Sequence, residues 1–169
     1  MRFAYADPPY IGISYRYPEK TEVDHAALVA RLVADYPDGW ALSCTSSSLQ
    51  YLLGLCPEGV RIGAWVKPYA PFKINVNPAY AWEPLIVYGG RRRGRDKLTM
   101  NDWIKTNTVI HQSVLGEKPE LFVWWLIEML GMEPSDELDD LFPGSGNVTR
   151  SLDVWRSQRT LCFGGENGE

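Results

Sequence analysis

The chain is predicted to fold as an α/β domain whose mostly parallel, twisted sheet is covered by helices on both faces. Short apolar segments with strand character alternate with helical segments along nearly all of its 169 residues, and this alternation is typical of parallel sheets. The content of 45% hydrophobic and 22% charged residues is that of a globular domain with a substantial core. No repeat or internal boundary is visible, so we expect a single domain over 1–169.

The first half of the chain contains most of the expected sheet. Its elements are, in order, a strand at 2–6, a helix at 21–36, a strand at 40–44, a helix at 46–55, and strands at 60–66 and 83–88. Thr21 is the predicted N-cap of the first helix, with Asp24 three residues later. A turn at Pro37-Asp38-Gly39 separates that helix from the next strand, and Pro57 stops the second helix.

The second half begins with a polar and basic stretch. Residues 89–117 show little periodicity, so we expect a long loop there, and 67–117 together form the expected small excursion on one side of the sheet. The elements expected after it are a helix at 119–130, a strand at 138–142, a tight glycine turn at 144–146, a helix at 147–157 and a last short strand at 160–163. Pro119 suits a first helical turn, and Gly131 is the predicted stop.

A glycine-rich turn lies between a predicted strand and the helix that follows it. Gly144-Ser145-Gly146 would bring backbone N–H groups and a helix N-terminus close to a ligand, and glycine permits that approach because it has no Cβ. The sequence lacks the Gly-Lys-Ser/Thr of a phosphate-binding P-loop and a third glycine at the dinucleotide spacing. A cofactor loop is favoured over the alternative, a plain strand-to-helix turn.

The tetrapeptide Asp7-Pro8-Pro9-Tyr10 follows the first predicted strand. A carboxylate at the carboxyl end of such a strand points into the crevice where open α/β sheets bind ligands. The two prolines fix the backbone and remove two N–H donors, which leaves carbonyl acceptors. An acid beside a free carbonyl suits an amino group with two hydrogens to donate, and Tyr10 could stack on a planar ring. The alternative is a proline-rich turn without a site.

The two motifs together carry a family resemblance. Asp7-Pro8-Pro9-Tyr10, followed more than a hundred residues later by Asp140-Leu141-Phe142-Pro143-Gly144-Ser145-Gly146, resembles the S-adenosylmethionine-dependent amino-methyltransferases of DNA. The order is similar to that of the circularly permuted adenine-N6 enzymes, in which the catalytic half precedes the cofactor half. Lys118-Pro119 before a helix and the strand segment at 82–87 also resemble that family. Small phage-encoded methylases are the expected relatives.

The resemblance implies a Rossmann-like methyltransferase fold and a set of substrate contacts. Asp7 and the Pro8 carbonyl would accept hydrogen bonds from the N6 amine of adenine, Pro9 would help to fix the backbone, and Tyr10 would stack on the base. The base must be flipped out, because the amine cannot be reached inside a duplex. Its nitrogen would attack the cofactor methyl group directly, and alignment of the reacting atoms would supply most of the acceleration.

The resemblance also implies the site for S-adenosylmethionine. The implied cofactor residues are Asp140, Phe142, Pro143, Gly144, Ser145 and Gly146 around the glycine loop, Lys118 and Pro119 near the methionine end, and Glu166 at the ribose. Glu169 is an alternative to Glu166, since an acid after the second strand binds the ribose hydroxyls in such folds.

The sequence departs from the family pattern in two regions. The chain stops soon after the glycine-loop helix and the short strand expected at 160–163, so an edge strand of the sheet is expected to be missing. The pocket for the adenine of the cofactor would then be shallow and cofactor affinity modest. The region available for reading DNA, 67–117, is also short, so we expect either low specificity or help from a second subunit in a homodimer.

A basic run is the candidate DNA contact. The net charge of −4 argues against general binding of polyanions, but five cations lie close together between positions 91 and 97, and such a patch can contact phosphates by itself. The candidate DNA-binding residues are Arg91, Arg92, Arg93, Arg95 and Lys97. The alternative is a solvated loop. The functional interpretation is favoured because the run lies where the family binds DNA.

Composition also limits the class of protein. No apolar run is long enough to span a bilayer, and the first residues lack the pattern of a signal peptide. The spacing of Cys44, Cys56 and Cys162 fits neither a metal site nor a disulfide framework. We therefore expect reduced thiols, no metal, no membrane partner and a location in the cytoplasm of a bacterial cell or phage-infected host.

Two further hypotheses stay open beside DNA adenine-N6 methylation. The first is methylation of RNA adenine or of cytosine N4, because a site for an exocyclic amine would be built similarly in all three cases. The second is a catalytically idle subunit that binds nucleic acid, which the short C-terminal part suggests. Nucleoside analysis after reaction with labelled cofactor separates the first from the leading hypothesis, and a cofactor-binding isotherm separates the second.

Overall fold

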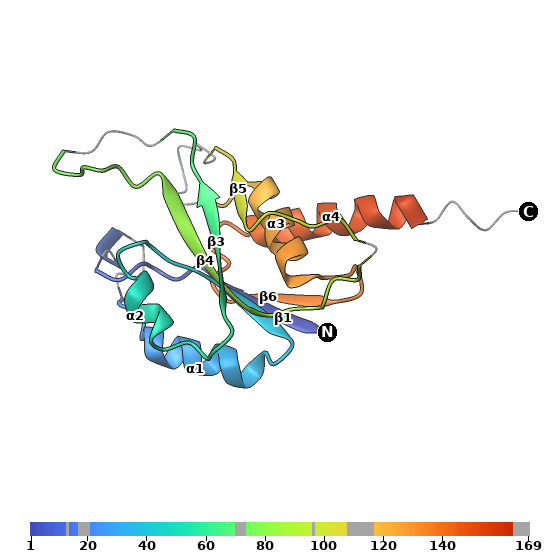
Figure 1. Ribbon diagram of the computed structural model, residues 1–169, viewed down its shortest axis with the longest axis horizontal. Coiled ribbons are helices and arrows are strands. Elements are labelled where there is room, and N and C mark those ends of the chain that lie inside the picture. The colour runs from blue at the N-terminus through green and yellow to red at the C-terminus, as the bar shows by residue number, and fades with distance from the viewer. Residues whose placement is uncertain (13, 17–20, 70–73, 96, 108–116, 164–169) are drawn as a thin grey trace, which may run out of the picture.

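A six-stranded sheet forms the centre of the molecule, in the strand order β5-β3-β4-β2-β1-β6 (Figure 1). The computed structural model describes residues 1–12, 14–16, 21–69, 74–95, 97–107 and 117–163. The strands are β1 (Arg2–Ala6), β2 (Gly39–Ser43), β3 (Arg61–Val66), β4 (Trp82–Gly89), β5 (Trp103–Lys105) and β6 (Glu137–Asp140). A short 3-10 turn at Ser14–Arg16 follows β1.

Only β4 runs against the other strands of the described sheet. β1 pairs in parallel with β2 and β6, and β3 pairs in parallel with β5, whereas β4 is antiparallel to both β2 and β3. The predicted mostly parallel sheet is therefore confirmed. The carboxyl ends of β1 and β6, together with the beginning of β4, meet at one edge, where α/β sheets usually bind ligands.

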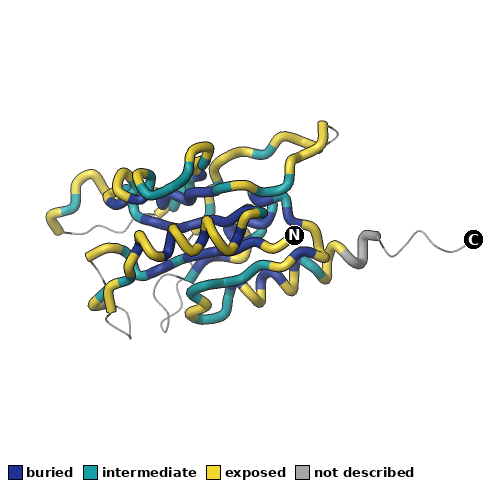
Figure 2. The backbone as a smooth tube through the Cα atoms, turned by 90° about the horizontal axis from the view of Figure 1, so that it is seen from below, coloured by how far each residue is buried: buried dark blue, intermediate teal, exposed yellow. Residues whose placement is uncertain are grey.

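Helices cover both faces of the sheet, as predicted. α3 (Glu120–Leu130) and α4 (Asn147–Phe163) pack on one face, while α1 (His25–Asp35) and α2 (Leu49–Leu53) pack on the other. Alternation along β1 divides the core: Phe3 and Tyr5 join the cluster with α3, and Ala4 and Ala6 join the cluster with α1. Figure 2 shows the resulting buried central strands between exposed outer helix surfaces.

The helix ends follow from local chemistry, with one correction. Asp24, rather than the predicted Thr21, caps α1, because its carboxylate accepts a hydrogen bond from the Ala27 N–H at 2.9 Å. Gly131 ends α3 as predicted. Its φ of +63° is left-handed, and an added Cβ would lie 2.6 Å from the Arg91 carbonyl oxygen. The first cap fixes where the chain enters α1, and the second fixes where it leaves α3.

Two predicted elements are wrong. The strand predicted at 160–163 belongs to α4, which runs to Phe163. No proline or glycine interrupts the chain between Asn147 and Gly164, and extending an existing helix is easier than starting a new element. The loop predicted at 89–117 contains β5, which escapes prediction because it is only three residues long. It is held by pairing with β3, for example Ala64 with Trp103.

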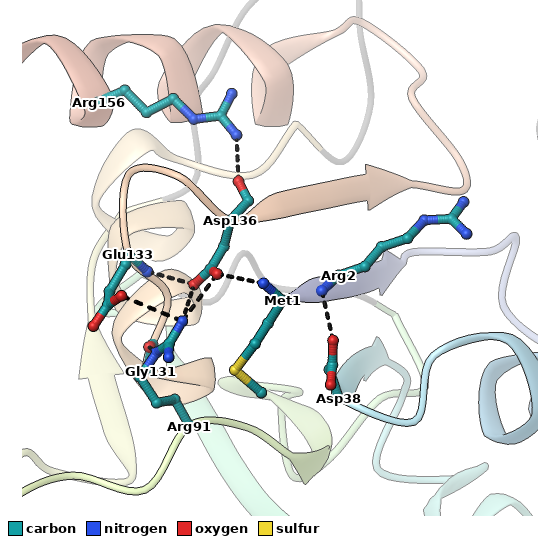
Figure 3. A network of polar contacts seen from close by, with 8 residues as sticks. All are labelled: Met1, Arg2, Asp38, Arg91, Gly131, Glu133, Asp136 and Arg156. Carbon is teal, nitrogen blue, oxygen red and sulfur yellow. Dashed lines mark hydrogen bonds and ion pairs between the residues drawn. The ribbon is translucent and has the colours of Figure 1, made fainter.

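A buried carboxylate joins the amino-terminal ends of β1 and β6 (Figure 3). Asp136 is 2% exposed, and its carboxylate accepts a hydrogen bond from the Met1 ammonium at 2.7 Å. Both of its oxygens also accept hydrogen bonds from Arg91 Nη2, at 2.9 and 2.8 Å. Burial opposes its ionisation, but the ammonium and the guanidinium outweigh burial and lower the pKa of Asp136 to about 2. This network lies at the edge of the sheet opposite the carboxyl ends of β1 and β6.

Candidate active site

Asp7 stands one residue beyond β1, at the carboxyl edge of the sheet. Its position follows the alternation of β1, so its side chain lies on the α3 side with Tyr5. Pro8 is buried, and Pro9 and Tyr10 are partly buried. The Tyr10 hydroxyl lies 3.4 Å from Asp7 Oδ1, so the two polar ends of the tetrapeptide face each other.

Lys118 binds Asp7 directly. Its ammonium lies 2.9 Å from Asp7 Oδ1 and 2.8 Å from Oδ2, and 3.3 Å from the Tyr10 hydroxyl. Lys118 comes from the segment just before α3 and its side chain is only 5% exposed. The structure therefore brings Lys118 to the Asp7 carboxylate, although the family resemblance implied a place near the methionine end of a cofactor.

Glu83 completes the site and was missed by sequence analysis. Oε2 of this β4 residue accepts a hydrogen bond from Lys67 Nζ at 2.8 Å. Its Oε1 lies 2.8 Å from Lys118 Nζ and forms an ion pair with it, without the alignment of a hydrogen bond. The glutamate side chain is 8% exposed. The Lys67 ammonium also lies 4.4 Å from the centre of the Trp65 ring. A charged residue at an otherwise apolar strand position, Trp82-Glu83-Pro84, was the available signal.

The pKa values of the site reflect burial balanced against these ion pairs. Burial raises the pKa of Asp7, with Lys118 opposing and Glu83 adding to the rise. For Glu83, burial opposes ionisation, but Lys118 and Lys67 lower its pKa to about 2. For Lys118, burial is outweighed by Asp7 and Glu83, so its pKa lies well above the ordinary value. The site thus holds charged groups on both sides of Lys118.

The glycine loop connects β6 to α4 beside this group. Gly144 and Gly146 have left-handed φ values of +47° and +73°, which glycine adopts readily. The side-chain amide of Asn147 donates to the Lys118 carbonyl oxygen, which ties the start of α4 to the segment before α3. Ser145 Oγ lies 3.4 Å from a carboxylate oxygen of Glu117. The predicted cofactor loop and the Lys118-Pro119 segment are therefore neighbours in space.

Asp140 lies at the end of β6, beside β1. Its register partner is Tyr5, and one carboxylate oxygen accepts the Phe142 N–H at 3.2 Å. The other oxygen, Oδ2, is buried and has no hydrogen-bond partner among the described residues. Burial raises the pKa of Asp140, and the nearby Asp7 charge adds to the rise. A buried carboxylate oxygen without a partner is costly, and it fits a ligand that brings a donor.

The other predicted cofactor residues lie in different surroundings. Phe142 packs against the core cluster under α1, Pro143 is exposed at the loop, and Pro119 is buried before α3. Glu166 and the alternative Glu169 lie outside the described residues. The residues that fit an S-adenosylmethionine group here are thus Asp140, with its unpartnered oxygen, and the glycine loop at the start of α4.

The basic run divides into two kinds of residues. Arg91 binds Asp136, and Arg93 Nη2 lies 2.5 Å from Glu128, so both carry internal ion pairs. Arg92, Arg95 and Lys97 are exposed, and none of them forms an ion pair within the described part of the chain. The prediction of five DNA contacts stays a prediction, and Arg91 and Arg93 would have to contact a phosphate in addition to their internal ion pairs.

Replacing Arg91 should test this division. We expect Arg91→Ala to lower the free energy of unfolding, because Asp136 loses one of the partners that keep its pKa low and retains, among the described residues, only the Met1 ammonium as a cation. The loss should shrink as pH falls from about 4 toward 2, where Asp136 becomes protonated. Denaturant unfolding at several pH values measures it. Arg95→Ala is the matched control and should leave stability unchanged.

The described residues give no sign of a membrane or metal site. No helix in the described ranges combines the length and apolarity that a membrane crossing needs. Likewise, no group of three or more His, Cys, Asp or Glu side chains is arranged to hold a metal ion within those ranges. Cys44 is a buried free thiol whose pKa burial raises to about 12, and Cys56 is a partly buried free thiol. The Cys162 side chain lies outside the described part.

Comparisons with known proteins bear on the fold. No protein-family model and no curated protein sequence matches the chain. A crystal structure of the M1.HpyAVI–SAM complex is 18% identical with a TM-score of 0.59, and the match covers 92% of this chain and 77% of that one. A crystal structure of M1.HpyAVI is 16% identical with a TM-score of 0.55, covering 92% and 76%. The chain therefore has a Rossmann-like α/β fold similar to that of M1.HpyAVI.

Proposed function

We propose that the chain transfers a methyl group from S-adenosylmethionine to the N6 amine of adenine in DNA. One observation carries the proposal: the Asp7 carboxylate and the glycine loop after Asp140 stand at the ends of adjacent parallel strands. Methyl transfer to nitrogen requires a hydrogen-bond acceptor for the substrate amine beside a loop that can bind the cofactor. The fold shared with M1.HpyAVI, whose structure is a complex with SAM, supports the same proposal.

The proposed chemistry assigns a task to each group. The bound cofactor supplies a methyl group on a positively charged sulfur. Asp7 accepts a hydrogen bond from the amine, which directs the nitrogen lone pair toward the methyl carbon. When the new bond forms, Asp7 is placed to take the proton that the nitrogen loses, and its raised pKa suits that step. Tyr10 stacks on the flipped base, once the base displaces its contact with Asp7.

The cofactor is proposed to bind along the end of β6. Asp140 Oδ2 would accept a donor from the positively charged methionine part, and the Gly144–Gly146 turn would let the ligand approach the backbone. β6 lies at the edge of the described sheet. The adenosine part would accordingly be held from one side, which agrees with the modest affinity expected from the sequence.

The decisive experiment is methylation of unmodified DNA with isotope-labelled cofactor. Nucleosides released from the product are analysed by mass spectrometry, with RNA of the same sequence tested in parallel. Labelled N6-methyladenine from DNA is the expected result. Label in cytosine N4 or only in RNA would replace the proposal by the corresponding alternative, and no label from a folded, cofactor-binding protein would contradict methyl transfer to nucleic acid.

An uncovered part of the sheet is the proposed surface for the DNA strand. Trp82 of β4 is 40% exposed and Trp103 of β5 is 49% exposed. Strand register places both on the face opposite α3, together with Val66 and Lys105. Exposed aromatic rings near a cation are suited to stacking on unpaired bases. This face reaches the same carboxyl edge of the sheet as Asp7.

Removing these rings should weaken DNA binding without affecting the cofactor. We expect Trp82→Ala and Trp103→Ala each to raise the Kd for single-stranded DNA about 10-fold, on the scale of one lost base stack. Fluorescence anisotropy with a labelled oligonucleotide measures the change. Tyr51→Ala is the control, because Tyr51 is 54% exposed on α2. Equal Kd values for all three variants and the parent would remove this surface from the DNA site.

A further inference from the structure

A row of four ionised side chains with alternating charge runs through the candidate active site. Lys67, Glu83, Lys118 and Asp7 are joined by three contacts of 2.8 Å between nitrogen and oxygen. They come from the end of β3, from β4, from the segment before α3 and from the end of β1. The two central members, Glu83 and Lys118, have side chains only 8% and 5% exposed. Such a buried row needs every charge balanced by a neighbour.

The hydrogen-bond acceptor that the amino group of a substrate would need, the Asp7 carboxylate, is already paired with Lys118. Lys118 contacts both oxygens of Asp7, at 2.9 and 2.8 Å. An incoming amino group can therefore donate to Asp7 only if Lys118 weakens at least one of these contacts. A buried ammonium gives up a carboxylate contact easily only when a second carboxylate keeps it balanced. Glu83 is this second carboxylate. Because Lys67 also pairs with Glu83, Lys67 determines how strongly Glu83 attracts Lys118.

We propose that Glu83 and Lys67 are positioning residues that act through Lys118 and determine how readily Asp7 accepts the substrate amine. This inference rests on the proposed function, since it takes Asp7 as the amine acceptor. The other titratable groups facing Asp7 are Tyr10, Tyr5 and Asp140. None of these carries positive charge, so within the described residues the balance of cations at Asp7 depends on Lys118 and its partners.

The proposal predicts opposite effects for the two outer members of the row. Glu83→Gln removes a negative charge and leaves Lys118 with Asp7 as its only carboxylate, which should lower the Asp7 pKa by about one unit. Lys67→Met removes a positive charge and lets Glu83 draw Lys118 away from Asp7. The Asp7 pKa should then rise by about half a unit. A role in packing alone would leave the Asp7 pKa unchanged in both variants. Direct charge effects of Glu83 and Lys67 would persist when Lys118 is replaced by Met, whereas an effect that acts through Lys118 disappears in that background.

The test measures Asp7 directly, without any need for activity. Protein with ¹³C-carboxyl-labelled aspartate is titrated by NMR in the cofactor-free state, and the Asp7 signal is identified by its loss in Asp7→Ala. Opposite shifts in Glu83→Gln and Lys67→Met are expected. Shifts of the same sign, or unchanged values in both, would overturn the inference. If Glu83→Gln does not fold, the more exposed Lys67 still decides, because an unchanged or lowered value in Lys67→Met overturns it alone.

Kinetics provide a second measurement that depends on the proposed function. If DNA is methylated, Glu83→Gln should raise KM for DNA about 10-fold with a smaller change in kcat, and Lys67→Arg should behave as the parent. Asp136→Asn is the control, since it breaks a buried ion pair at the opposite edge of the sheet and should change stability but not the Asp7 titration. Absence of methylation with the expected NMR shifts would reject the function while keeping the charge row.

Discussion

Asp7→Ala is expected to lower kcat/KM for methyl transfer by about 10²–10³-fold, the usual cost of removing one polar group placed at the reacting atoms. The substitution removes the acceptor for the amine and also the partner of Lys118 on that side. Cofactor affinity should stay within a few-fold of the parent, because the glycine loop and Asp140 are unchanged. Calorimetry with S-adenosylmethionine and single-turnover methylation of DNA measure the two quantities separately.

The pH dependence gives an independent check on Asp7. Burial raises the Asp7 pKa above its ordinary value, and only the ionised form can take the proton that the substrate nitrogen loses. Activity should therefore fall as pH decreases through this raised pKa, at a higher pH than an ordinary aspartate would give. Turnover of folded Asp7→Ala within a few-fold of the parent would show that Asp7 is not at the reacting centre.

Local sequence signals were sufficient for most of the fold. The apolar runs that became β1 to β4 and the Gly131 end of α3 depend on neighbours in the chain, whereas the N-cap of α1 was placed three residues early, at Thr21 instead of Asp24. β5 could not be found in this way, because three residues carry little periodicity and its stability comes from pairing with β3. The strand expected at 160–163 failed for the opposite reason, since β-favouring side chains there continue a helix already formed.

The candidate site shows the same limit. The sequence identified Asp7, Lys118 and Asp140, which the fold brings to one edge of the sheet. Glu83 and Lys67 were missed because their importance lies in contacts across the fold, between β4, the end of β3 and the segment before α3. Arg91 shows the same limit. The basic run predicts a DNA contact there, and the structure adds a partner that the sequence does not reveal, Asp136, which lies 45 positions later in the chain.

Asp140→Asn is expected to have two effects of opposite sign. Cofactor affinity should fall about 10- to 100-fold, the scale of one lost charge-assisted hydrogen bond. The cofactor-free protein should become more stable near neutral pH. Burial raises the pKa of Asp140 in the folded state, so the ionised Asp140 carboxylate lowers stability above that pKa. The neutral amide of the asparagine avoids this cost. Calorimetric titration and thermal unfolding without ligand give the two values.

Asp139→Asn is the matched control for this pair of effects. Its carboxylate faces other partners, with Oδ2 lying 2.5 Å from Arg2 Nη2 and 2.7 Å from the Tyr36 hydroxyl. Losing that charge should lower stability and leave cofactor affinity unchanged. A residue whose charge destabilises the empty protein but strengthens ligand binding is one placed for the ligand rather than for the fold. If Asp140→Asn behaved like Asp139→Asn, Asp140 would be a structural residue, and the cofactor would have to bind elsewhere.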